Sequence, residues 1–78
     1  MKKNQTIQRK ILKHLGINIK YHRTKLNMSQ ESLAFEIGVD RTYITAIENG
    51  TKSPSLYCLY LLAQRFGISL QDLLNINI

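Results

Sequence analysis

The side chains best suited to chemistry in this sequence lie in one short segment, DRTYITAIEN at residues 40–49. An arginine can bond guanine O6 and N7 together, and a threonine can donate or accept a hydrogen bond or set its methyl group against thymine. If the segment is a helix, its first turns carry these polar groups, with small residues that allow close approach to a DNA groove. The residues predicted to read base edges are Arg41, Thr42, Thr45 and Ala46.

Groups that could catalyse a reaction are scarce: the chain has two histidines, one cysteine and five acidic residues. His14 and His22 are eight residues apart, so they form neither a His-x-x-x-His metal pair nor a catalytic dyad. Gly-rich phosphate loops are absent, and we interpret Cys58 as a small, partly buried side chain. The sequence therefore predicts a protein that is not an enzyme, with no catalytic residue, no metal site and no cofactor.

Size and charge further limit the classes of function that the chain could have. Seventy-eight residues make one small domain, and the 44% hydrophobic content is typical of a folded chain. The net charge is +6, and residues 1–30 contain no acid, which suits a polyanionic partner. With no long apolar run and no signal peptide, we expect a cytoplasmic protein without a membrane partner. We divide the chain into a basic arm or helix extension, residues 1–13, and a DNA-binding domain, residues 14–78.

The periodicity of apolar residues predicts five helices and no strand. The first begins at about Thr6 or Arg9 and ends at Leu26, and a close helix contact would explain Gly16 inside it. Ser29 is a strong N-cap for the second helix. The third helix, residues 41–48, should end at Asn49-Gly50, because both residues accept positive φ.

The fourth helix is predicted to start at Ser53-Pro54, with serine as the cap and proline at the first helical position. Its apolar stripe would begin at Leu56, and Gly67 would end it. Ser69 then begins a short fifth helix.

Residues 30–49, QESLAFEIGVDRTYITAIEN, read as a helix, a three-residue turn and a second helix. Leu33, Ile37, Ile44 and Ile47 sit where two crossed helices would bury them, and Gly38 sits at the turn. This pattern is typical of a helix-turn-helix, whose second helix enters the DNA major groove.

At these residues the sequence resembles the DNA-binding domain of lambda-type phage repressors and Cro proteins, the xenobiotic-response-element family of regulators. The matching segments are LGINIKYHRTKLNMSQESLAFEIGVDRTYITAIENGTKSPSL and LAQRFGISLQDLL. Within the family, DRTYI is similar to the controller proteins of restriction–modification systems, which are small, freestanding and dimeric. The resemblance implies an all-α, compact five-helix lambda-repressor-like domain. It also implies a sequence-specific transcriptional regulator that binds double-stranded DNA as a dimer on a palindromic operator.

Further residues would hold the DNA backbone. Gln30 opens the second helix, where its side chain and free N–H groups can bind a phosphate. The resemblance implies this role for Gln30 and Asn49, and a DNA contact for Tyr43, whose ring could instead cover the core. Lys52 and Ser53 are further phosphate candidates, although Lys52 could simply be solvated.

Arg23 and Glu48 occupy inward-facing positions of their helices, and two opposite buried charges are expected to pair. The resemblance implies the same bridge, which we interpret as a structural ion pair that orients the third helix.

A domain of this size reads few base pairs, so specificity calls for a homodimer. The C-terminal NINI could belong to the contact surface, with Ile78 included, or form a frayed tail. The predicted interface residues are Leu56, Tyr57, Tyr60, Ile68, Leu70, Leu74 and Ile76. RNA polymerase is a further candidate partner. The alternative function is a protein-binding module or an antitoxin-like partner with the same fold.

Overall fold

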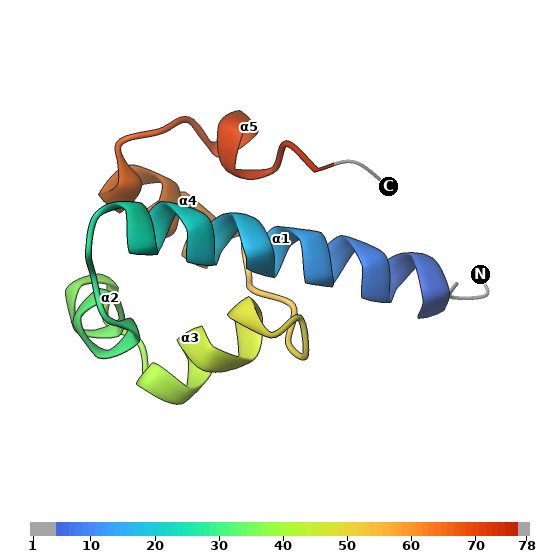
Figure 1. Ribbon diagram of the computed structural model, residues 1–78, viewed down its shortest axis with the longest axis horizontal. Helices are drawn as coiled ribbons and strands as arrows, with labels where there is room; N and C mark the ends of the chain where they lie inside the picture. The colour runs from blue at the N-terminus through green and yellow to red at the C-terminus, as the bar shows by residue number, and fades with distance from the viewer. Residues whose placement is uncertain (1–4, 77–78) are drawn as a thin grey trace.

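The computed structural model of this chain describes residues 5–76, so Ile78 and the first part of the predicted arm lie outside the described residues. Within that range the chain forms helices and no strand, which confirms the predicted all-α class. The helices are α1 (Gln5–Lys25), α2 (Gln30–Ile37), α3 (Arg41–Glu48), α4 (Leu56–Phe66) and α5 (Leu70–Leu73). In Figure 1, α1 crosses the molecule, with α2 and α3 below it and α5 above it.

Serine hydroxyls cap three of the helices. Ser29 accepts a hydrogen bond from the backbone N–H of Ser32, Ser55 from that of Cys58, and Ser69 from that of Asp72. Each bond satisfies one of the backbone donors that the first helical turn leaves unpaired. The caps at Ser29 and Ser69 were predicted from the sequence.

The predicted start of the fourth helix is wrong. Its N-cap is Ser55 and its first residue is Leu56, while Pro54 is buried in the loop before it. This register leaves Leu56 on the outer side of α4, 68% exposed, and not on the buried stripe. The predicted end of the third helix is confirmed: Asn49 is its C-cap with a φ of −81°, and Gly50 supplies the positive φ, 74°.

One core holds the helices together. The side chains buried most completely come from all five helices and are Ile19, Leu33, Ile44, Ile47, Leu62 and Leu73. Because every helix contributes to the same cluster, the position of α3 is fixed by packing against its neighbours. Among residues 5–76, no helix combines the length and the apolar character that crossing a bilayer requires.

Gly16 marks the closest approach of α1 to α3. A Cβ atom at this position would lie 2.6 Å from the carbonyl oxygen of Ile47 and would also collide with that of Glu48. Only a glycine lets the two backbones meet so closely, so the predicted helix contact at Gly16 is confirmed.

Candidate nucleic-acid interface

The turn between α2 and α3 sets the direction in which α3 leaves the core. Gly38 adopts a φ of 79°, a left-handed conformation that suits glycine. The backbone N–H of Val39 donates to the carbonyl of Ala34 at 2.9 Å, which closes the end of α2. The chain then turns straight into α3, as the helix-turn-helix pattern predicts.

Helix α3 has one buried and one open side. Ile44 and Ile47 are buried in the core. The residues predicted to read bases are all at least partly accessible: Arg41 and Thr42 are exposed, and Thr45 and Ala46 are half-buried. An amphipathic helix of this kind can stay packed on the domain while its polar side meets a partner.

The ion pair between α1 and α3 is bidentate and buried. Arg23 Nε donates to Glu48 Oε2 at 2.6 Å, and Arg23 Nη2 donates to Glu48 Oε1 at 3.0 Å. The third donor, Arg23 Nη1, bonds the carbonyl oxygen of Met28 at 2.6 Å. Only 8% of Arg23 and 7% of Glu48 is exposed. The hydrogen bond with Glu48 raises the pKa of Arg23 above its ordinary value, against the opposing effect of burial.

Gln30 links this ion pair to the open side of α3. Its Nε2 donates to Glu48 Oε1 at 3.0 Å, and its Oε1 accepts from the hydroxyl of Thr45 at 2.7 Å. The sequence predicts a phosphate contact for Gln30 and gives no sign of this bridge, because residues 30, 45 and 48 meet only in the folded chain. An amide nitrogen carries two hydrogens, so one can still bond a phosphate.

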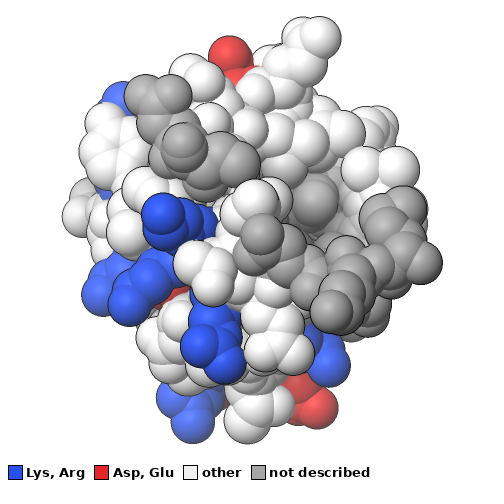
Figure 2. Space-filling view, turned by 90° about the vertical axis from the view of Figure 1, so that its right-hand side faces the viewer, with Lys and Arg blue, Asp and Glu red and all other residues white. Residues whose placement is uncertain are grey.

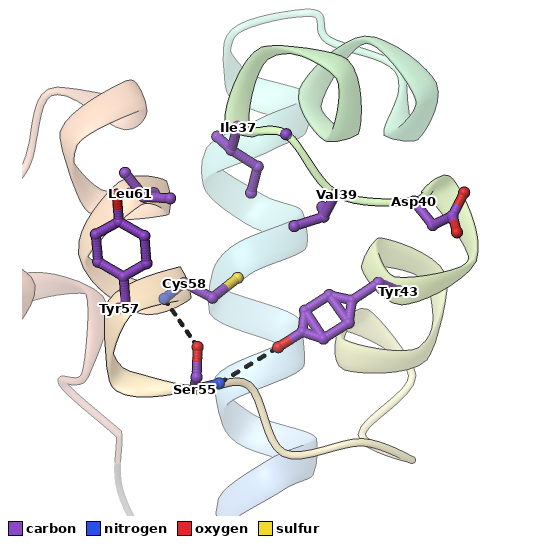
Figure 3. A pocket seen from close by; sticks show the side chains of 9 residues that line it. Ile37, Val39, Asp40, Tyr43, Ser55, Tyr57, Cys58 and Leu61 are labelled. Atoms are coloured by element: carbon purple, nitrogen blue, oxygen red, sulfur yellow. Dashed lines mark hydrogen bonds between the residues drawn. The ribbon is translucent and has the colours of Figure 1, made fainter.

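Tyr43 lines an open cleft of about 500 Å³ between the α2–α3 turn and α4 (Figure 3). Its ring packs against the core, and its hydroxyl oxygen accepts a hydrogen bond from the backbone N–H of Ser55 at 3.3 Å. Burial raises the pKa of Tyr43, and burial likewise raises the pKa of the Cys58 thiol. Cys58 is 5% exposed and fills the role of a small core side chain.

These two shifts predict that the domain loses stability in alkali. A raised pKa means that the folded chain holds its proton to a higher pH than the unfolded chain does. Stability is therefore retained below the ordinary pKa of 9.0 for Cys58 and falls as the pH rises above it. The raised pKa of Tyr43 adds a further loss of stability above its ordinary value of 10.0. Urea unfolding at about pH 8 and about pH 11 measures the drop.

Cys58→Ala combined with Tyr43→Phe should flatten the pH dependence, because this variant lacks both groups whose pKa burial raises. An equally steep drop in the Cys58→Ala, Tyr43→Phe variant would contradict the assignment.

The loop after α3 lies beside the N-terminal half of α1. Asn49, Lys52 and Ser53 are all exposed, and Lys52 Nζ lies 5.6 Å from the centre of the Tyr43 ring. A Cβ atom at Gly50 would lie 3.0 Å from the Cα atom of Lys13, so the N-terminal half of α1 adjoins this loop.

Figure 2 shows Lys and Arg side chains gathered on the left and lower parts of the end of the molecule it presents. No phosphate contact in α1 was predicted from the sequence. The excess of lysine and arginine before residue 30 indicated a polyanion-binding role for this part of the chain, but only the fold places Lys13 beside this loop.

The residues predicted for a dimer contact fall into two groups. Leu56, Tyr57, Tyr60 and Leu74 are exposed, by 68%, 70%, 48% and 38%. Ile68 and Leu70 are half-buried and pack against the core, and Ile76 is also half-buried. In residues 5–76, His, Cys, Asp and Glu side chains do not cluster in threes that could hold a metal ion.

The sequence pattern of the helix-turn-helix family HTH_3 matches residues 19–73. The chain belongs to this family. It is 42% identical over 55 residues to the uncharacterised helix-turn-helix transcriptional regulator MJ0272 of Methanocaldococcus jannaschii, which covers 70% of this chain and 83% of that protein.

Two solved structures of restriction–modification controller proteins share the fold. One is C.AhdI from Aeromonas hydrophila, with a TM-score of 0.76, 35% identity and coverage of 80% of this chain and 94% of that one. The other is the C.Esp1396I tetramer in complex with its natural 35-base-pair operator, with a TM-score of 0.72, 30% identity and coverage of 82% and 88%.

Proposed function

We propose that this helix-turn-helix protein is a cytoplasmic, sequence-specific transcriptional regulator that binds a palindromic operator in double-stranded DNA as a homodimer. The observation that carries the proposal is the setting of α3: a buried ion pair and two buried isoleucines hold it, while Arg41 and Thr42 stay open. A helix held in this way loses little freedom when it enters a major groove.

The likeness to controller proteins, one of them bound to its operator, supports a restriction–modification controller as the particular role. Arg41, Thr42, Thr45 and Ala46 would then meet base edges. The backbone contacts would come from Gln30, Tyr43, Asn49, Lys52 and Ser53, with Lys13 added from the fold. The chain has no catalytic part in this proposal, and contact with RNA polymerase stays a prediction.

The proposed dimer uses the outer side of α4 and the segment that follows it. Leu56 and Tyr57 are the most exposed apolar residues there, and exposed apolar groups close together favour a contact surface. A twofold pair of domains would present two copies of α3 to half-sites about 34 Å apart.

Selection of a binding site from random DNA, followed by gel-shift assays at two salt concentrations, tests the function. Specific binding should persist near about 0.15 M salt, with affinity falling steeply as salt rises because bound phosphates release counterions. Weak binding without sequence preference would favour the protein-binding alternative instead. Sedimentation of the free protein and of its operator complex tests the dimer.

Arg41→Ala should weaken specific binding by about 10- to 100-fold per half-site, because a bidentate arginine–guanine contact is worth about 1–3 kcal/mol. Competition with the selected operator and with single-base variants measures the loss.

Arg65→Ala is the matched control, since it removes the same charge from α4, where Arg65 Nε pairs with Glu36 Oε1 at 2.5 Å on the surface. Equal losses in the two variants would show that Arg41 contributes only charge and reads no base.

A further inference from the structure

The hydroxyl of Thr45 ends a chain of polar contacts that begins at the core ion pair. Arg23 and Gln30 both donate to Glu48 Oε1, each at 3.0 Å. On its other side, Gln30 Oε1 accepts from Thr45 Oγ1 at 2.7 Å. The contacts therefore run from a buried guanidinium on α1 to a half-buried hydroxyl on the open side of α3.

Each step of this chain fixes the direction of the next hydrogen bond. A carboxylate paired with arginine can only accept, so the amide nitrogen of Gln30 must face Glu48. The amide oxygen of Gln30 then faces Thr45, and it too can only accept. The single hydroxyl hydrogen of Thr45 is therefore directed toward Gln30. Its other neighbour, the carbonyl oxygen of Arg41 at 3.1 Å, is also an acceptor, so the hydrogen points into the protein with either partner.

The hydroxyl of Thr45 consequently offers only oxygen lone pairs to a partner in front of α3. In the major groove the hydrogen-bond donors are the N4 amino group of cytosine and the N6 amino group of adenine, whereas guanine and thymine present acceptors. Resting on the proposed function, we infer that Thr45 is a specificity-determining residue. It accepts from cytosine or adenine at one base of each half-site and disfavours guanine and thymine there.

Thr42 provides a matched contrast on the same helix. It is exposed, and within residues 5–76 its hydroxyl has no hydrogen-bond partner. A free threonine hydroxyl can rotate to donate or to accept. The preference for an amino group therefore belongs to Thr45 and does not follow from threonine as a residue type.

The test removes single amino groups from the operator obtained by selection. Each adenine of a half-site is replaced in turn by purine, and each cytosine by pyrimidin-2-one, and affinities are measured by titration. The affinity of the wild-type protein should fall about three- to tenfold when the amino group at one position is removed, which corresponds to one net hydrogen bond. Thr45→Val should abolish that dependence, because it keeps the shape and removes the hydroxyl. Thr45→Ser and Thr42→Val should both preserve it.

Two results would overturn the inference while leaving the proposed function intact. One is a specific operator for which removal of each amino group weakens binding equally in the wild type and in Thr45→Val. The other is a dependence on guanine N7, shown by substitution with 7-deazaguanine, that disappears in Thr45→Val, because the hydroxyl would then be donating. If selection enriches no sequence at all, the proposed function fails, and this inference fails with it. Thermal unfolding by circular dichroism confirms that each variant is folded.

Discussion

Replacing Glu48 by alanine is expected to cost the domain about 3–5 kcal/mol in its free energy of unfolding. The variant would leave the Arg23 guanidinium buried, with the carbonyl oxygen of Met28 as its remaining partner. It would also leave the Nε2 of Gln30 without the acceptor it bonds in the folded chain. Since small domains are stable by only about 5–15 kcal/mol, this loss would remove a large share of the stability of the domain. Urea denaturation followed by circular dichroism measures it.

The double variant Arg23→Met, Glu48→Leu provides the decisive comparison. It removes both charges and fills the space with apolar groups, which is often neutral or even stabilising for a buried ion pair. We expect it to be clearly more stable than Glu48→Ala or Arg23→Ala alone. In a cycle built from the two alanine variants and their combination, the coupling free energy should reach about 2 kcal/mol. Additive losses in that cycle would show that the pair contributes nothing as a pair.

The second large effect concerns Gly16, where helix propensity and packing predict opposite signs. Alanine in a helix interior is favoured over glycine by about 1 kcal/mol, so propensity alone predicts that Gly16→Ala stabilises α1. The Cβ atom of that alanine would collide with the backbone carbonyls of Ile47 and Glu48, however. Because those atoms belong to α3 and not to a flexible side chain, the helices must move apart. We expect a net loss of about 3 kcal/mol, measured by chemical denaturation.

Gly67→Ala serves as the control for Gly16→Ala. Unlike Gly16, Gly67 lies outside a helix, at the C-cap of α4 with a φ of 72°, and a Cβ atom there would meet nothing within 4 Å. Its substitution should cost only the strain of a left-handed alanine, about 1–2 kcal/mol. A Gly16→Ala variant more stable than the wild type would mean that α1 and α3 can separate without cost.

Gly16 also affects the proposed function, because the contact it permits sets the distance between α3 and α1. A shift of α3 would move Arg41 and Thr45 together relative to the groove, while the chain could remain folded. Weaker operator binding in a folded Gly16→Ala variant would therefore reflect the position of α3 and not the loss of a contact.

Much of the fold followed from local chemistry. The caps at Ser29 and Ser69, the left-handed glycines at 38 and 67, and the apolar spacing predicted where most helices begin and end. The start of the fourth helix was predicted wrongly because two serines flank Pro54, and local preference alone cannot choose between them. Burial of the proline in the loop selected Ser55.

The candidate site, too, could be predicted from the sequence only in part. The open side of α3 could be predicted, because the period of a helix separates Ile44 and Ile47 from Arg41. The link from Glu48 through Gln30 to Thr45 could not, because these three residues belong to different turns of two helices. These residues meet because α2 and α3 cross. Residue spacing within one helix carries no information about that crossing.

The helical class of the protein, most of its helix ends and the residues open for recognition could be predicted from interactions between near neighbours in the chain, and its basic charge from composition. The hydrogen-bonding role of Thr45 and the position of Lys13 beside the loop after α3 became known from the folded chain alone. A hydroxyl takes its direction from the partners around it, and the packing of separate helices brings those partners together.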